Sequence, residues 1–170
     1  MARLFVAVWP PDDVLDQVAR LTRPPVEGVR WTGREQWHVT LRFLGPVDDR
    51  AAVVRALDGV GDGLGRVEAL AGPAVGRFAN RVLHLPVSGL EPLAALVVDA
   101  TSGIGRPPED RPFAGHLTLA RVAKGARVDL GPLAGGAVSA RWEVAEVCLV
   151  ESHLAPTGAR YEVVESFALS

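Results

Sequence analysis

Two histidine motifs of the same form, one in each half of the chain, combine residue types that can transfer protons and bind phosphate. His38 and Thr40 make up the first motif, and His116 and Thr118 make up the second. Imidazoles titrate near neutral pH, so two of them can act as a complementary acid and base. Threonine hydroxyls donate hydrogen bonds to anionic oxygens. Together the motifs indicate acid–base chemistry on a phosphodiester.

Such a set can cleave a phosphodiester without a metal ion. One imidazole takes a proton from water while the other gives a proton to the leaving oxygen. An arginine beside them would stabilise the charge on the remaining phosphate oxygens. Acid–base assistance of this kind contributes roughly 10²–10⁴-fold in rate. Either histidine can take either role.

Polar and apolar residues alternate through both motifs, which predicts strands with one buried face. Val39 and Leu41 separate the polar residues of the first motif, and the second motif repeats the pattern. Because successive side chains point to opposite faces, the histidine and threonine of each motif share a face. Two such strands can line one cleft. The same parity points Arg42 into the cleft and turns Phe43 and Arg121 away, unless the strand twists, bulges or ends there.

Apolar periodicity and turn residues predict the elements that hold these two strands. Three helices are expected, one opened by Pro10-Pro11-Asp12-Asp13, one by Asp48-Asp49, and one capped by Ser88 that runs to about Thr101. Gly45-Pro46 is expected to end the first histidine strand. The expected strands are Arg3–Trp9, Val29–Trp31, Gln36–Leu44, Val67–Leu70, Ala74–Phe78, Arg81–Val87, the second motif, Val144–Val150 and Tyr161–Leu169.

This order of elements predicts an α+β fold. Each half of the chain offers a histidine strand with helices and further strands around it, so we expect two pseudo-symmetric lobes. Each lobe would be an antiparallel sheet flanked by helices, with a cleft between the lobes. No long polar linker separates the halves, and residues 1–170 are therefore expected to form a single domain of two intertwined lobes.

Composition excludes several classes of protein. The formal charge of −2 and the pI near 6.1 leave no global basic surface of the kind that coats duplex nucleic acid, so any such contact must be local. The single cysteine, Cys148, cannot form an internal disulfide, which favours a reducing compartment. No apolar run approaches the ~18 residues of a membrane span. We expect a soluble, cytoplasmic, monomeric protein with no membrane partner.

No other ligand site is expected from the sequence. The glycine-rich segment 61–65 lacks the lysine and Ser/Thr of a phosphate-binding loop. A zinc site is the alternative for the four histidines, but none of them has the helical spacing or cysteine partners that such sites favour. His84 is expected to line a sheet, and His153 to lie in a turn.

Both motifs and their surroundings resemble the two-histidine (2H) phosphoesterase superfamily, and within it the RNA 2′,3′-cyclic phosphodiesterases first named 2′-5′ RNA ligases. The pair is specific because Phe43-Leu44-Gly45 closes the first motif and Arg121 follows the second. Gly115 departs from the pattern, since the family commonly has proline there, and is expected to loosen the start of the second strand. The resemblance covers nearly the whole chain, through Arg3–Val8, Trp37–Gly45, Arg111–Arg121, Glu151–Leu154 and Pro156–Tyr161.

The resemblance implies an activity and a set of roles. The reaction is hydrolysis of a terminal 2′,3′-cyclic phosphate on RNA to a 2′-phosphate, without metal or other cofactor, and with weak reverse 2′-5′ joining from microscopic reversibility. The partner is RNA with such an end, or a cyclic nucleotide. The residues implied are His38 and His116 as the catalytic acid and base, Thr40, Thr118 and Arg121 as phosphate ligands, and Phe43 as a candidate to stack on the terminal base.

Two other functions fit the same residues. The cleft can hold an RNA 3′ end or a nucleotide phosphate without turnover, as a binding module, although a pure binder needs no acid–base pair. A hydrolase of the same superfamily can instead act on small cyclic nucleotides or on 2′-5′ oligonucleotides. Product formation in EDTA distinguishes the cyclic phosphodiesterase from a binding module. A comparison of the rates on short RNA and on mononucleotides distinguishes it from the small-substrate hydrolase.

Overall fold

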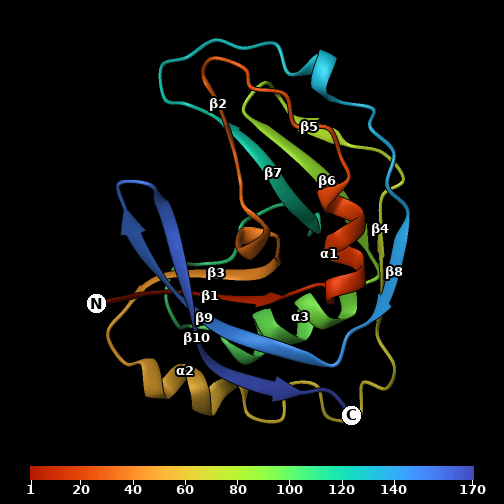
Figure 1. Cartoon of the computed structure of the whole chain (residues 1–170). Helices are drawn as coiled ribbons and strands as arrows, with labels where there is room; N and C mark the ends of the chain where they lie inside the picture. Colours follow the sequence, from red (N-terminus) through yellow and green to blue (C-terminus); the bar gives the residue numbers. More distant parts are fainter.

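Ten antiparallel strands form one curled sheet in the computed structural model, which describes residues 1–170 (Figure 1). Eight of them follow the order β10-β9-β1-β3-β7-β6-β4-β8, while β2 pairs with β7 and β5 with β6. With three α-helices the fold is α+β, as predicted. The strands are β1 (Ala2–Val8), β2 (Val29–Trp31), β3 (Val39–Val47), β4 (Glu68–Ala71), β5 (Gly76–Phe78), β6 (Val82–Ser88), β7 (His116–Val122), β8 (Ala140–Glu143), β9 (Glu146–Ala155) and β10 (Gly158–Ala168).

The first lobe is built around β1, which lies between β3 and β9. Residues 4–8 of β1 are all buried, and a continuous apolar run of this length suits a strand covered on both faces. β9 and β10 form a long hairpin, and its tip rises from this lobe toward the second lobe (Figure 1). The tip therefore stands at the edge of the space between the lobes.

The second lobe is built around β7, which pairs with β6 on one side and with β2 and β3 on the other. β4 and β8 extend this half of the sheet beyond β6. Because β2 precedes β3 in the chain but pairs with β7, the chain crosses between the lobes just before His38. The lobes are intertwined in sequence for this reason.

Within the sheet, the two lobes are joined by one register pair between β3 and β7, Val39 and Leu117. Each of these residues directly follows a motif histidine. The sheet is therefore continuous but narrowest beside His38 and His116. We call this pair the seam.

Three α-helices cover the sheet: α1 (Asp12–Ala19), α2 (Arg50–Leu57) and α3 (Glu91–Ala100). Their apolar sides are buried, as the spacing of their apolar residues predicts. The Asp49 carboxylate caps α2 by accepting a hydrogen bond from the Ala52 N–H at 3.0 Å. Ser88 does not cap the third helix as predicted, because it is the last residue of β6 and α3 starts after Leu90.

Two predicted chain breaks lie inside strands. Gly45 and Pro46 belong to β3, where they pair with Leu4 and Arg3 of β1. The flexibility of Gly45 is used, since it adopts a φ of 71°, but pairing continues to Val47. His153, predicted to lie in a turn, is in β9 with its Nε2 3.2 Å from the Glu162 carboxylate of β10.

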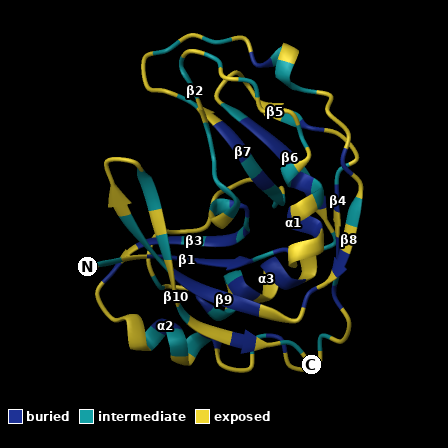
Figure 2. Cartoon of the chain, viewed as in Figure 1, coloured by how far each residue is buried: buried dark blue, intermediate teal, exposed yellow.

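The core runs through both lobes. Thirty-four buried apolar residues from the two lobes form one cluster, so neither lobe has a separate core (Figure 2). A small second cluster lies on the other side of β1, where Phe5, Cys148 and Val150 are buried together with Ala7. Cys148 is a buried free thiol, as expected of a small apolar side chain.

Candidate active site

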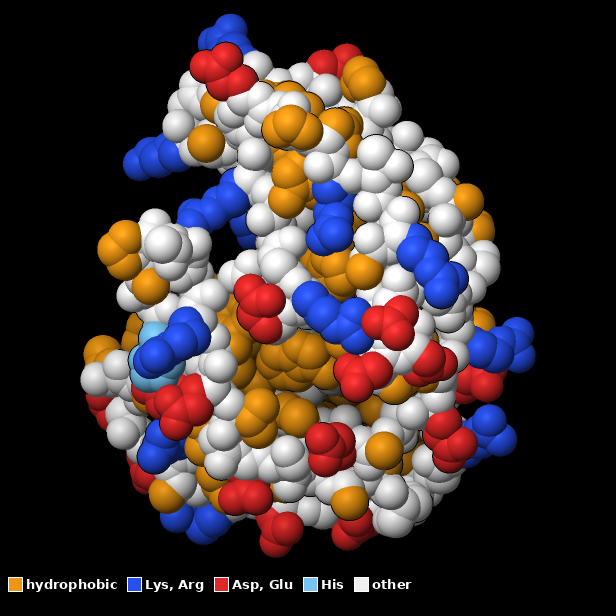
Figure 3. All heavy atoms as spheres, in the orientation of Figure 1, with side chains coloured by type: hydrophobic (Ala, Val, Ile, Leu, Met, Phe, Trp, Pro, Cys, Tyr) orange, Lys and Arg blue, Asp and Glu red, His pale blue; other side chains and the backbone are white.

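A cleft of about 370 Å³ lies between the two lobes. The molecular surface is notched between the second lobe and the β9–β10 hairpin, and Lys and Arg side chains border this notch (Figure 3). All the predicted site residues line the cleft: His38, Thr40 and Phe43 at β3, and His116, Thr118 and Arg121 on β7. The two motifs therefore face one space, as the sequence predicts.

A bulge in β3 explains why Phe43 reaches the cleft against its parity. Ala7 of β1 pairs with Thr40, but Val6 pairs with Arg42, so Leu41 has no partner. An extra residue in one strand reverses the alternation beyond it. Phe43 consequently shares a face with Thr40.

β7 carries the same irregularity at the same place in its motif. His84 of β6 pairs with Thr118, but Leu83 pairs with Ala120, which leaves Leu119 without a partner. Arg121 is therefore brought to the side of His116. A bulge is thus the exception that brings Arg121 to the cleft, whereas regular alternation would point it away.

The prediction that Arg42 points into the cleft is wrong. The bulge turns its side chain to the opposite face of β3, where it is 5% exposed. Its guanidinium donates to the backbone carbonyls of Arg106 at 2.8 Å and Ile104 at 3.3 Å, and to Thr101 Oγ1 at 3.3 Å. Arg42 thus binds the end of α3 and the loop that follows it.

Both motif histidines have their tautomer set by the backbone. The Nδ1 atom of His38 lies 2.8 Å from the Gln36 carbonyl, and that of His116 lies 2.8 Å from the Ala114 carbonyl. A carbonyl only accepts, so each Nδ1 carries the proton. Each neutral ring therefore keeps its Nε2 lone pair. In His38 this atom is 3.1 Å from Thr40 Oγ1, which can donate to it.

Burial favours the neutral form of both rings. Burial, against the bond to Gln36 and with a smaller effect from the positive charges of His116 and Arg121, lowers the pKa of His38 to about 4. Burial also lowers the pKa of His116, with Arg121 acting in the same direction. A phosphate anion between the rings would raise both pKa values, because a negative charge stabilises imidazolium. Anion binding and protonation are therefore coupled at this site.

Aromatic rings hold His38 in place. The ring centroids of Phe5, Trp9 and Tyr161 each lie 5.0 Å from the centroid of the imidazole. Tyr161 also lines the cleft, and burial raises the pKa of its hydroxyl. Its hydroxyl is thus a neutral donor at pH 7. The sequence predicts a strand at Tyr161, and the family resemblance reaches this residue, but neither assigns it to the cleft.

His116 is packed against a different pair of rings. The imidazole of His84 stacks on Phe78 with centroids 3.9 Å apart, and the edge of His116 meets both rings, at 5.6 Å and 4.9 Å respectively. His84 is 9% exposed, and burial lowers its pKa to about 4. Its strand position agrees with the prediction that it lines the sheet. A neutral ring here supports His116 without adding charge.

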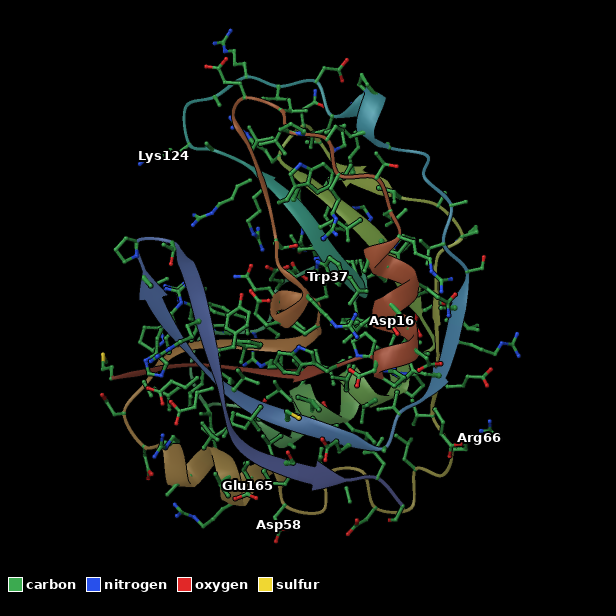
Figure 4. All side chains as sticks on the ribbon, viewed as in Figure 1. Asp16, Trp37, Asp58, Arg66, Lys124 and Glu165 are labelled. Carbon is green, nitrogen blue, oxygen red and sulfur yellow. The ribbon has the colours of Figure 1, made fainter.

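Thr32 connects the two motifs. Its backbone N–H donates to the Leu119 carbonyl at 2.9 Å, and its hydroxyl lies 2.7 Å from the Thr118 carbonyl and 2.9 Å from that of Leu119. The same hydroxyl accepts a bond from Nε1 of Trp37 at 3.0 Å. Trp37 lies between the lobes (Figure 4) and is fully buried. Thr32 therefore binds the bulge of β7 to the residue that precedes His38, a link no local pattern predicts.

Guanidinium groups lie over Phe43. The Cζ of Arg3 is 5.1 Å from the ring centroid and that of Arg106 is 5.7 Å from it. Arg3 also lines the cleft. A base that stacks at this place would meet a planar cation as well as the phenyl ring.

Positive charge dominates the cleft. Arg3, Arg30 and Arg121 line it, no Asp or Glu does, and none of the three forms an ion pair with a carboxylate. Such a site favours an anionic ligand. No group of three or more His, Cys, Asp or Glu side chains is arranged to hold a metal ion. None of the helices combines the length and apolar character needed to cross a membrane.

Gly115, where a looser strand was expected, is tightly packed. Its carbonyl accepts a bond from the Val87 N–H at 2.8 Å. A Cβ at this position would lie 2.4 Å from the Val87 carbonyl oxygen, so the close pairing of β6 and β7 requires glycine here.

The chain was compared with known proteins. The family model of the 2′-5′ RNA ligase superfamily matches residues 10–155. TT0787 of Thermus thermophilus is 31% identical, with a TM-score of 0.77 and coverage of 98% of this chain and 97% of that one. E. coli LigT complexed with 3′-AMP is 27% identical, with a TM-score of 0.74 and coverage of 99% and 98%.

A structure described as a phosphoesterase is similar to the same degree, with 28% identity, a TM-score of 0.75 and coverage of 99% and 98%. No curated protein matches the sequence. The family model spans most of the chain, and the fold and both motifs agree with it. The chain belongs to the 2′-5′ RNA ligase superfamily of two-histidine phosphoesterases.

Proposed function

We propose that this protein hydrolyses the 2′,3′-cyclic phosphate at the 3′ end of RNA to a 2′-phosphate, with His38 and His116 as its acid–base pair. Membership of the superfamily supports phosphodiester chemistry on RNA in general. The acid–base roles are supported by one observation: both imidazole rings line the same cleft. Each has its Nδ1 bound to a backbone carbonyl, which leaves its Nε2 for proton transfer.

The proposed reaction balances without a cofactor. Water attacks the phosphorus in line with the 3′ oxygen, one neutral imidazole accepts the proton of water, and the bond from phosphorus to the 3′ oxygen breaks. The other ring, protonated, gives its proton to that oxygen. Thr40, Thr118 and Arg121 line the cleft beside the rings and are proposed to bind the non-bridging oxygens. Exchange with solvent returns the two rings to their starting protonation states.

The low pKa of the free rings supports this scheme. Burial lowers the pKa of both rings in the free protein. A bound anionic substrate would raise both pKa values, so the proton needed by the acid would be taken up together with the substrate. The two rings then share one proton, and their titration belongs to the pair.

Incubation in EDTA with a short RNA that ends in a 2′,3′-cyclic phosphate tests the proposal. Phosphorus NMR should show the cyclic signal replaced by a 2′-monoester. A 3′-monoester would mean that the leaving oxygen is the 2′ oxygen, and tight binding without product would identify a binding module. Turnover of cyclic mononucleotides but not of RNA would identify a small-nucleotide hydrolase.

Substitution of either histidine provides the matched control. His38→Ala and His116→Ala should each lower kcat by about 10²–10⁴-fold. His38 packs among aromatic rings, so His38→Gln is included to fill that space. Circular dichroism and melting temperature should show a folded protein in each case. Loss of the fold in all three variants would mean that the rings serve packing.

A further inference from the structure

Arg30 and Arg121 form an unusual pair in the wall of the cleft. Arg30 of β2 lies directly opposite Arg121 of β7 in the sheet register, and both side chains are exposed and line the cleft. Like charges directly opposite each other on neighbouring strands destabilise a sheet. Since neither guanidinium is paired with a carboxylate, the arrangement favours the binding of more than one negative charge.

The two guanidiniums serve different parts of the cleft. Arg121 lies on the strand of His116, and its charge lowers the pKa of both motif histidines. Arg30 reaches the hairpin tip, where its Nη2 lies 3.1 Å from the position that a Cβ on Gly158 would take. Gly158 has a φ of 124°, so both its conformation and its space suit glycine. Arg30 thus spans the mouth of the cleft from β2 to β10.

A second contact holds the hairpin tip beside this part of the cleft. The Gln36 side chain donates a hydrogen bond to the Ala159 carbonyl at 2.9 Å, next to Gly158. The hairpin tip, β2 and the segment before His38 therefore meet around Arg30. Arg30 therefore lines the cleft where β2 approaches the hairpin tip, apart from the two histidines at β3 and β7.

We propose that Arg30 binds the phosphodiester on the 5′ side of the terminal nucleotide, while Arg121 serves the cyclic phosphate. The inference rests on the proposed function and specifies its substrate as an oligonucleotide. RNA offers one phosphate per nucleotide in series, whereas a cyclic mononucleotide offers one phosphate in all. The planar guanidinium matches a phosphodiester with two parallel hydrogen bonds. The second cation therefore discriminates RNA ends from mononucleotides.

A double cycle between protein and substrate tests this contact. Arg30→Gln is compared with the wild type on a dinucleotide that ends in a 2′,3′-cyclic phosphate, on the same dinucleotide with an uncharged methylphosphonate linkage, and on a cyclic mononucleotide. Arg30→Gln should lower kcat/KM on the charged dinucleotide by about ten- to hundredfold. It should leave kcat/KM on the methylphosphonate and on the mononucleotide unchanged.

Two controls show whether an effect of Arg30→Gln comes from the loss of this phosphate contact or from the general loss of a positive charge. Arg127→Gln removes an exposed arginine of the same lobe that does not line the cleft, and should match the wild type on all three substrates. Loss of one phosphate contact should also reduce the slope of log(kcat/KM) against log salt by about 0.7 for the charged dinucleotide.

Two results would overturn the inference. An equal loss on mononucleotide and dinucleotide would place Arg30 at the cyclic phosphate, and an equal methylphosphonate penalty in both proteins would show that Arg30 does not sense the internal phosphodiester. Failure of the proposed function is separate, because it appears as absence of turnover in the wild type. In that case the wild type and Arg30→Gln are compared by their Kd values for the charged and the methylphosphonate dinucleotide, each ending in a 2′-phosphate.

Discussion

Leu41 and Leu119 are structural equivalents: each is the unpaired residue of a strand bulge, and each follows a cleft histidine by three positions. The bulges return the fifth residue after each histidine to the cleft, which brings Phe43 and Arg121 to the site. The first bulge at the same time turns Arg42 into the protein interior. Arg42 is therefore buried, whereas Arg121 is exposed in the cleft.

Arg121→Gln should impair the reaction and not the fold. Its side chain is exposed in the cleft and has no carboxylate partner, so little stability depends on it. Loss of one positioned donor to the transition state typically costs about 10²–10³-fold in rate. Steady-state kinetics on a cyclic-ended RNA and a melting curve measure the two effects. Wild-type kinetics would refute a role for Arg121 at the phosphate.

Arg42→Met should do the reverse. It leaves the buried Thr101 hydroxyl and the partly buried carbonyls of Ile104 and Arg106 without their donor. Unpaired groups of this kind cost about 1–3 kcal/mol each, so the free energy of unfolding should fall by at least about 2 kcal/mol. Urea unfolding gives this value, while kcat measured well below the melting temperature should stay within about threefold. A large kinetic loss without destabilisation would place Arg42 at the substrate.

Thr32→Val should lower both stability and activity. The substitution removes the hydroxyl that joins buried Trp37 to the carbonyls of the β7 bulge, and leaves the indole N–H without its acceptor. We expect a loss of about 1–3 kcal/mol in the free energy of unfolding. A fall in kcat should accompany it, because the link lies between the two motifs.

Thr32→Ser is the control for that substitution, since it keeps the hydroxyl. It should restore most of the kcat and of the stability lost in the valine variant. If serine and valine behave alike, the methyl group and not the hydrogen bonds is what matters at this position.

Acid should destabilise the protein through two buried rings. The pKa values of His38 and His84 are about 4 in the folded protein, below the value of 6.5 for an unperturbed ring. Between pH 6.5 and 4 the unfolded chain therefore binds more protons than the folded one, so the free energy of unfolding falls as the pH falls. The loss by pH 4 is up to about 3 kcal/mol for each ring, and is absent above pH 6.5.

Urea unfolding at pH 7, 5.5 and 4 measures this dependence. His84→Phe preserves a ring that can stack on Phe78 and removes one titrating group, so its stability should fall less between pH 7 and pH 4. If the free energy of unfolding has the same pH dependence in the variant and the wild type, protonation of His84 does not cause the loss of stability in acid.

The fold class and the facing motifs could be predicted because they rest on local signals. Alternation identified β3 and β7, and apolar spacing identified the three helices. Boundaries were less accurate. Gly45 and Pro46 are breakers in isolation, yet pairing with β1 keeps them in β3, and the hairpin of β9 and β10 extends beyond its apolar part.

The composition of the cleft was only partly predictable. Parity fails at Leu41 and Leu119 because a bulge depends on the partner strand, which the local sequence does not contain. Arg30 and Thr32 reach the cleft because β2 and the residue after it pair with β7, which is distant in the sequence, and no motif marks either residue. A resemblance to a family supplied Arg121 and Phe43 where alternation pointed elsewhere.

The seam has a mechanical consequence. Val39 and Leu117 are the one register pair between β3 and β7, so a tilt of one lobe against the other, to the extent that the common core and Thr32 allow it, would pivot on them. Displacement grows with distance from a pivot, so the rim formed by β2 and the hairpin would travel far while the imidazoles, one residue from the axis, would barely separate. The width of the cleft entrance can therefore change with little change in the spacing of His38 and His116.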